Sequence, residues 1–600
     1  MTVSAPRWDM TNVYPSLESK KFKAALASYK KQVAALDRFF TSKVSKATAK
    51  TPAKQLAALV GTMVDRINEI QTLSATINPY IYSFVTTNSR DALAAKTMSE
   101  FEQVSLPMNK LDVRFRAWLG RIEPKLPQAT KLSKPAKAHA FFLKEAAHQS
   151  KYLMSEPEES LAAEMTLSGG NAFDKLQGTF SSQLTADFEL DGKMQKLPLT
   201  TLIYLRSHPD EPTRRRGYEA ENKIYEGTKE IFAACLNGVK GETITLSKRR
   251  GRKDAIELSL VASRIDRKTL EAMLGAMQDS FPMFRKYFRA KAKKLGKERL
   301  PWWDVFAPMG RADQVYSYEE ARLFILENFG RFSPELRDFA RRAFDNRWID
   351  AEQRDGKRAG AYCMEVQGPK ESRVFANFDG SFDAVSTLAH ELGHAFHNEC
   401  AYRAGKTVLQ QLTPMTLAET ASIMCETIVT EAVLATTKDP QVILGTLENQ
   451  IQGAGQTVVD IYSRYLFEKE VFERREKAEL AADDFNDAME RAQKATYGDG
   501  LDERHLQKFM WTWKPHYYSP GLPFYNYPYA FGLLFGKGLY AIYQQRGPAF
   551  VTDYKNLLAS TGEAQAATLA KRFGIDIRTP KFWQDSLAMV GKQIDRYVAL

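Results

Sequence analysis

The sequence has few cysteines and lacks the long apolar run of a membrane span. Four of its 600 residues are cysteine, and no two of them form a CxxC pair, so a disulfide scaffold is not expected. No stretch of about 20 uninterrupted apolar residues is present, which predicts a protein without a transmembrane helix. The opening residues, MTVSAPRWDM, are not followed by the apolar segment of a secretory signal. We therefore expect a cytoplasmic protein with buried, reduced cysteines.

The composition is that of a globular protein with a basic excess. Hydrophobic residues make up 44% of the chain and charged residues 26%, and the formal net charge is +12. The basic run KRRGRK at 248–253 and the arginines at 214–216 invite a nucleic-acid-binding interpretation. No zinc-finger, helix-turn-helix or RNP motif accompanies them. We interpret them as solvated helix faces and expect no nucleic-acid partner.

Hydrophobic spacing predicts a mainly α-helical chain. Apolar positions recur three and four apart, as in amphipathic helices, over 19–41, 52–78, 89–120 and 134–150. Asp191-Gly192 between two alternating segments predicts a β-hairpin with a type I′ turn over 187–199. Two further short strands are expected within 361–378, around a Gly-Pro turn. We place the domain boundary at the hairpin, which yields an N-terminal helical lobe, 1–198, and a second domain, 199–600.

Residues 390–394 read His-Glu-Leu-Gly-His, an HExxH match. On an α-helix His390 and His394 lie about 40° apart and one turn along, so both imidazoles can face one metal ion. Glu391 flanks the same stripe and can take a proton from a water on the metal. Ser381 or Asp383 can cap the helix. This pattern predicts a zinc site of the metallopeptidase type.

The third ligand has several candidates. His397 lies about 10 Å along the helix from His390, which is too far for one ion on a straight helix, so we expect it in a supporting or core position. Glu419 and Glu426 are seven residues apart, on one face of the next helical segment. One of them fits a ligand and the other a partner that orients a histidine. Spacing alone favours Glu419 only weakly.

The late segment 515–532, PHYYSPGLPFYNYPYAFG, is too rich in proline for a plain helix. Considered alone, it is typical of an aromatic core loop. Beside a zinc site, its imidazole and phenol groups are instead candidate donors to the negative charge of a tetrahedral intermediate.

These motifs resemble the zinc oligopeptidase family of thimet oligopeptidase and oligoendopeptidase F, and the oligoendopeptidase F branch most. The resemblance rests on GKRAGAYC at 356–363, VFANFDGSFDAVSTLAHELGHAFH at 374–397, LAETASIMCE at 417–426 and PFYNYPYAFG at 523–532. It implies a two-lobed helical zincin with a small β-sheet beside the active-site helix and a deep substrate groove. It further implies His390, His394 and Glu419 as ligands of one zinc ion, with Glu426 behind them.

The resemblance also implies the remaining site residues. Glu391 is then the general base, and a histidine and a tyrosine that stabilise the oxyanion map onto His516 and Tyr527. Tyr525 and Tyr529 remain alternatives to Tyr527, because the three phenols are close together in sequence. The GAYC segment would line the groove, where a peptide can dock in extended form along the strands.

The sequence therefore predicts a zinc-dependent oligoendopeptidase that hydrolyses internal bonds of short, unstructured peptides by Glu-assisted attack of a water on zinc. A dipeptidyl-carboxypeptidase of the same family is the alternative within this class. A basic nucleic-acid-binding protein and a chaperone-like peptide binder are the rivals from other classes; the intact Glu391 argues against the binder, which has no need of a base.

Overall fold

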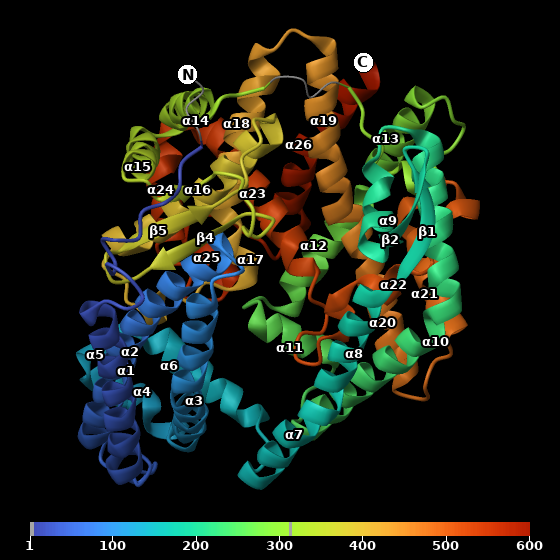
Figure 1. Ribbon diagram of the computed structural model, residues 1–600. Coiled ribbons are helices and arrows are strands. Elements are labelled where there is room, and N and C mark those ends of the chain that lie inside the picture. The colour runs from blue at the N-terminus through green and yellow to red at the C-terminus, as the bar shows by residue number, and fades with distance from the viewer. Residues whose placement is uncertain (1–4, 311–314) are drawn as a thin grey trace. The chain divides into compact units, whose positions relative to one another are not determined.

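The computed structural model describes residues 5–310 and 315–600. Helices dominate these residues, and the strands form only a two-stranded and a three-stranded sheet (Figure 1). The predicted mainly α class is thereby confirmed. No helix in the described part of the chain is both long enough and apolar enough to cross a bilayer. The chain divides into two compact units, each built from three separate segments.

The first unit comprises Met1–Leu153, Gln314–Val433 and Ile542–Phe573. Its helices are α1 (Lys20–Phe39), α2 (Ala53–Thr87), α3 (Ala92–Arg121), α4 (Leu126–Leu132), α5 (Lys134–Ala138), α6 (Ala140–Gln149), α14 (Tyr318–Phe332), α15 (Pro334–Asp345), α16 (Phe382–Arg403), α17 (Met415–Ala418), α24 (Phe550–Leu558) and α25 (Ala566–Arg572). Helix α18 (Thr420–Thr436) starts in this unit, and α23 (Tyr527–Arg546) ends in it.

The four amphipathic patterns near the N-terminus all fold as helices. Helices α1, α2 and α3 fall on the first three of them, and α5 and α6 on the fourth. Their apolar stripes bury large side chains such as Val60, Phe115 and Trp118 in one shared core. This burial stabilises the helices beyond what their intrinsic propensities provide.

The second unit comprises Met154–Asp313, Leu434–Ala541 and Gly574–Leu600. Its elements are α7 (Glu156–Ser168), α8 (Gly170–Gln183), β1 (Thr185–Leu190), β2 (Lys193–Pro198), α9 (Leu199–Tyr204), α10 (Glu211–Arg249), α11 (Ala255–Ala262), α12 (Arg267–Asp279), α13 (Phe281–Lys294), α19 (Pro440–Gly455), α20 (Ile461–Arg475), α21 (Ala482–Tyr497), α22 (Met510–Trp513) and α26 (Pro580–Ala599).

The hairpin predicted from Asp191-Gly192 is present. Strands β1 and β2 pair antiparallel, with Leu190 opposite Lys193, so the loop has two residues. Asp191 has φ 52° and Gly192 has φ 73°. Two positive φ angles in a two-residue loop define the type I′ turn.

The sheet of the first unit has the order β3–β5–β4. Strands β4 (Tyr362–Val366) and β5 (Glu371–Phe375) are the two runs predicted within 361–378, and they pair antiparallel. Strand β3 (Ile349–Asp350), which was not predicted, adds in parallel to β5. Helix α16 packs on β4 and β5 (Figure 1). The sheet therefore sets the position of the helix that carries the HExxH residues.

The compact units do not coincide with the predicted domains 1–198 and 199–600. Position 198 lies inside the second unit, because α10 packs against α8, α9 and β1. The division by chain order, including an N-terminal lobe that ends at 198, stays a prediction.

Candidate metal centre

Helix α16 presents the HExxH residues from a well-capped start. The Ser381 side chain accepts a hydrogen bond from the Ala384 N–H, and the Asp379 carboxylate accepts one from the Ser381 N–H. Of the two predicted caps, Ser381 is therefore the one used. The N-cap bond satisfies a free helix N–H and marks where the helix starts, and the four-residue spacing of His390 and His394 places them on one face of that helix.

His390, His394 and Glu419 meet in space. The Nε2 atoms of the two histidines lie 3.2 and 3.4 Å from the same oxygen, Glu419 Oε2. One ligand atom from each residue lies within 4.8 Å of the other two, and no other such group occurs within 5–310 and 315–600. Two imidazoles and one carboxylate are a donor set that suits zinc.

The charges within this group are strongly coupled. Burial alone would lower the pKa of His390, but contacts with Glu419 and Glu426 outweigh it and raise the pKa to about 10. Burial alone would raise the pKa of Glu419, but hydrogen bonds with the two histidines hold it well below its usual range. The two carboxylates thus favour the protonated form of the His390 imidazole. A dication can replace that proton, because ligand histidines bind metal in the neutral form.

Glu391 faces the same space with a free acceptor. Its side chain is only 6% exposed, and its Oε2 has no hydrogen-bond partner. Burial raises the pKa of its carboxyl group. A buried carboxylate oxygen without a partner is costly and calls for an explanation. It is free to accept a proton from a molecule that enters the site.

These side chains line a cavity of about 590 Å³, here called the metal-site cavity, which lies wholly within the first unit. Strand β4, helix α16 and the segment 411–419 form its walls. Its lining residues are Ala361, Tyr362, Cys363, Glu365, His390, Glu391, His394, His397, Asn398, Gln411, Leu412, Thr413, Ala418 and Glu419.

The two residues expected beside the ligands occupy different positions. Glu426 Oε2 lies 3.2 Å from Nδ1 of His390, the ring nitrogen that faces away from Glu419. A carboxylate at this nitrogen orients the ring and selects its tautomer. His397 lies outside the metal-binding group, with Nε2 2.9 Å from Thr561 Oγ1. Burial, followed by the charge of His394, lowers the pKa of His397 to about 4, so it is a neutral core histidine at pH 7.

His516 and Tyr527 both belong to the second unit. The His516 ring stacks on Tyr525, with centroids 5.5 Å apart, and its Nε2 is buried without a partner. Burial, followed by the charge of Arg464, lowers the pKa of His516 to about 3.

The three candidate tyrosines of the late segment differ in the partners of their hydroxyl groups. Tyr527 is 1% exposed, donates to Ser263 Oγ and accepts from Ser259 Oγ. The hydroxyls of Tyr525 and Tyr529 lie 2.9 Å from each other, and Tyr529 is 40% exposed. The donor of Tyr527 is thus already engaged within its own unit.

The cavity residues that were not singled out from the sequence include Cys363 and Glu365. Cys363 and Glu365 are two positions apart in β4, so they share a face of the strand, and both line the metal-site cavity. The sequence signal for them was the alternation of side chains along a strand, in a segment that was already expected to line the groove. It could not show which of the two faces turns towards α16.

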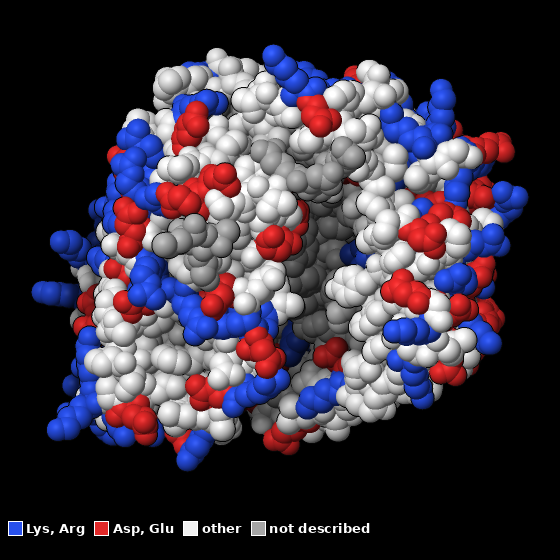
Figure 2. Space-filling model, turned by 45° about the horizontal axis from the view of Figure 1, so that its top comes forward, with Lys and Arg blue, Asp and Glu red and all other residues white. Residues whose placement is uncertain are grey.

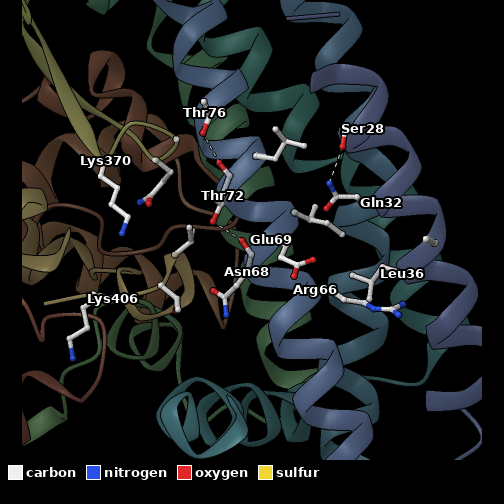
Figure 3. A pocket seen from close by; sticks show the side chains of 18 of the residues that line it. Ser28, Gln32, Leu36, Arg66, Asn68, Glu69, Thr72, Thr76, Lys370 and Lys406 are labelled. Atoms are coloured by element: carbon white, nitrogen blue, oxygen red, sulfur yellow. Dashed lines mark hydrogen bonds between the residues drawn. The ribbon is translucent and has the colours of Figure 1, made fainter. Parts of the chain in front are cut away.

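A second, larger cavity of about 890 Å³ lies between α1, α2 and the segments 367–370 and 405–408. Figure 3 shows Lys370 and Lys406 on one wall and Arg66 and Glu69 on the α2 side. Lys406 is already paired with Glu563 at 2.8 Å. No histidine or cysteine lines this α1–α2 cavity, and its lining contains no group that could hold a metal.

Several bacterial oligopeptidases are similar in sequence to this chain. Group B oligopeptidase PepB of Streptococcus agalactiae is 24% identical over 520 residues, which cover 84% of each chain. Oligopeptidase PepF of Bacillus subtilis is 23% identical over 481 residues, which cover 79% of this chain and 70% of PepF.

Solved structures show the same fold. A Chlamydophila abortus chain described as a peptidase superposes with a TM-score of 0.84 at 19% identity and covers 99% of this chain and 98% of its own. Oligoendopeptidase F of Enterococcus faecium superposes with a TM-score of 0.68 at 19% identity. The match covers 96% of this chain and 98% of the Enterococcus chain.

The sequence profile of peptidase family M3 matches residues 204–589, which include every member of the metal-binding group. Because this match spans well over half of the chain, the protein belongs to peptidase family M3.

Proposed function

We propose that this M3 peptidase is a zinc-dependent oligoendopeptidase that cleaves internal bonds of short, unstructured peptides. The observation that carries the proposal is the convergence of His390, His394 and Glu419 beside the free oxygen of Glu391. The names of the oligopeptidases PepB and PepF support short peptides as substrates.

His390, His394 and Glu419 would hold one zinc ion, with Glu426 fixing the ring of His390. When bound, zinc supplies Lewis acidity, which polarises a peptide carbonyl and lowers the pKa of a water towards 7. Three protein ligands leave a position for water or substrate, as in other catalytic zinc sites.

Glu391 would act as the general base and then as the general acid. Its free Oε2 accepts a proton from the attacking water, and the carboxyl group then passes it to the leaving amine. Burial raises the pKa of Glu391, which makes its carboxylate a stronger base for the proton that it takes from the water.

His516 and Tyr527 are proposed to stabilise the oxyanion, as the family resemblance implies. The unpartnered Nε2 of His516 supports its role, because it leaves a ring nitrogen free for a ligand. The hydroxyl of Tyr527 is occupied by two serines, so Tyr525 and Tyr529 stay as alternatives. A cytoplasmic location is also proposed, since all four cysteines are free thiols.

A peptide length series tests the proposed function. Purified protein is incubated with peptides of increasing length, and cleavage sites are assigned by mass spectrometry with and without a zinc chelator. We expect internal cleavage that the chelator abolishes and added zinc restores. Consistent removal of C-terminal dipeptides would instead identify a dipeptidyl-carboxypeptidase, and activity indifferent to chelation would contradict a zinc enzyme.

Glu391→Gln isolates the base from the metal site. The variant should retain zinc, because Glu391 is not among the grouped ligands, while kcat falls by about 10² to 10⁴-fold. Zinc content and steady-state kinetics measure the two effects separately. Near wild-type turnover by the zinc-loaded variant would refute the assignment of the base.

A further inference from the structure

The metal-site cavity has an unbalanced charge. Three carboxylates line it, from Glu365, Glu391 and Glu419, and its lining contains no lysine or arginine. Two of these three have a role in the proposed function, where Glu419 holds the ion and Glu391 is the base. With a zinc dication, the formal sum of these two carboxylates and the ion is zero. Glu365 therefore leaves the cavity with one uncompensated negative charge.

Glu365 is held in place by a neutral group. Gln367 Nε2 donates to Glu365 Oε2 and to Gln411 Oε1, both at 2.9 Å. Gln367 is only 5% exposed, so its amide is held in place beside the carboxylate. Within the described chain, no lysine or arginine forms an ion pair with Glu365, although most acidic side chains of the neighbouring strands and loops have such a partner.

Burial raises the pKa of the Glu365 carboxyl group, and the hydrogen bond from Gln367 opposes this rise only in part. A partly buried carboxylate without a cation has lost part of its hydration and gained no compensating charge. A cationic ligand would supply that charge. Forming an ion pair normally costs a carboxylate part of its hydration. Glu365 has already lost that hydration on folding, so this cost opposes the binding of a cation less.

The position of Glu365 along β4 indicates which side chain of a bound peptide it would contact. Cys363 and Glu391 line the same cavity, so this part of β4 lies beside the proposed base. Glu365 follows on the same face of the strand, about 7 Å further along. Side chains two apart in an extended peptide have the same spacing. A peptide lying along β4 thus brings a side chain about two residues from its scissile bond to Glu365.

We propose that Glu365 is a specificity-determining residue that selects peptides with a lysine or arginine about two residues from the cleaved bond. The proposal rests on the proposed function, because it identifies the substrate class of the same cavity. The carboxylate accepts hydrogen bonds from the ammonium or guanidinium group, and Gln367 keeps it oriented. Peptides with an acidic residue at that position are disfavoured by charge repulsion.

The kinetic test uses sets of peptides that differ at one position. Lysine, norleucine and glutamate are placed in turn at each position around a cleavage site, and kcat/KM is measured for each. For the wild type we expect one position, about two residues from the bond, where lysine exceeds norleucine on the order of tenfold and glutamate is poorest. Glu365→Gln should bring lysine and norleucine to within about twofold, and Glu365→Lys should reverse the order of lysine and glutamate.

Glu69→Gln is the matched control. Glu69 is an exposed carboxylate of the α1–α2 cavity (Figure 3), so the variant makes the same charge change in the same unit outside the metal-site cavity. It should keep the wild-type preference. Circular dichroism and melting temperature check that each variant is folded. The wild-type comparison of peptides does not depend on any variant, so a poorly folded Glu365→Gln leaves the proposal testable.

Binding separates this inference from the proposed function. Zinc-loaded Glu391→Gln and its double variant with Glu365→Gln are titrated with fluorescent lysine and norleucine peptides, and anisotropy is recorded. Tighter binding of the lysine peptide that disappears in the double variant supports the role of Glu365, even if the wild type cleaves no peptide and the proposed function fails. Equal rates and equal binding for lysine and norleucine at every position, or a preference that survives Glu365→Gln, overturns it.

Discussion

Glu419 and Glu426 contact opposite sides of the His390 ring, so they can be distinguished by mutation. Glu419 belongs to the group that can hold a metal, whereas Glu426 contacts only the Nδ1 side of the ring. Glu419→Ala should abolish stable zinc binding, and Glu426→Ala should weaken it about 10- to 100-fold. Competition with a chromophoric chelator measures both affinities. The reverse order of the two effects would transfer the ligand role to Glu426.

His397 should make the stability of the protein depend on pH. Its folded-state pKa is about 4, below the ordinary value of 6.5, because it is buried. Below pH 6.5 the unfolded chain binds a proton that the folded chain does not, so stability falls as pH decreases from 6.5 to about 4 and then levels off. The full effect of such a shift is about 3 kcal/mol.

Comparing His397→Gln with the wild type by denaturant unfolding in the presence of a chelator isolates this contribution. The stability advantage of the wild type at pH 7 should shrink by about 3 kcal/mol at pH 4. His148→Gln, at an exposed position on α6, is the control and should leave the pH dependence unchanged. Parallel pH curves for the wild type and His397→Gln would disprove a neutral, buried His397.

At the scale of elements, the metal centre depends on the close approach of α16 and α18. A Cβ on Gly393 would lie 2.5 Å from the Ala421 carbonyl oxygen and 2.7 Å from Ser422 Cα. Both atoms are backbone, so a side chain at Gly393 would force the helices apart. Because Glu419 immediately precedes α18, this separation would also move a ligand away from His390 and His394.

Gly393→Ala should therefore lower stability by about 1–3 kcal/mol and weaken zinc binding together. Gly453→Ala in α19 is the matched control, because a Cβ there meets no atom within 4 Å. That change should be neutral or stabilise the helix by up to about 1 kcal/mol. Thermal unfolding and zinc competition measure both properties. Unaltered zinc affinity in Gly393→Ala would show that the helix contact does not set the position of Glu419.

Elements whose hydrogen bonds are local were predictable from the sequence. The β1–β2 turn follows from Asp191-Gly192, since only these two residues must adopt positive φ. Strand β3 was missed, because Ile349 and Asp350 pair with residues about 25 positions later and have no local signature. Helix ends were predicted to within a few residues for α1 and α3, whereas α2 continues to Thr87, beyond the predicted end at 78.

At the scale of the whole molecule, the basic excess is dispersed and partly used internally. On the face drawn in Figure 2, lysines and arginines are interspersed with aspartates and glutamates. Arg214 is buried against Asp304 at 2.8 Å, and Arg250 pairs with Glu159 at 2.7 Å. Both arginines belong to the runs that invited a nucleic-acid interpretation.

We therefore expect no specific binding of nucleic acid by the whole chain. Electrophoretic mobility shift with duplex and single-stranded DNA and with RNA, at about 50 and 200 mM salt, should show at most weak binding that disappears at the higher salt. Arg249→Ala, at an exposed position in the same run, should change nothing. Tight binding at 200 mM salt would contradict this expectation and support a nucleic-acid-binding protein.

The amino-acid sequence by itself determined the mainly helical class, the hairpin and the face shared by His390, Glu391 and His394. These features depend on residues at most a few positions apart, so local geometry specifies them. It also identified Glu419 and Glu426 as a pair, although spacing alone could not assign their roles.

Only the tertiary structure decided which side chains from distant segments meet. It brought Glu419 to both histidines, placed Glu426 on the outer nitrogen of His390, and turned Glu365 into the metal-site cavity. It also built each compact unit from three separate segments. Such contacts depend on how whole helices and strands pack. The burial of large apolar surfaces specifies that packing, and these surfaces join residues too far apart in the sequence for a local pattern to predict.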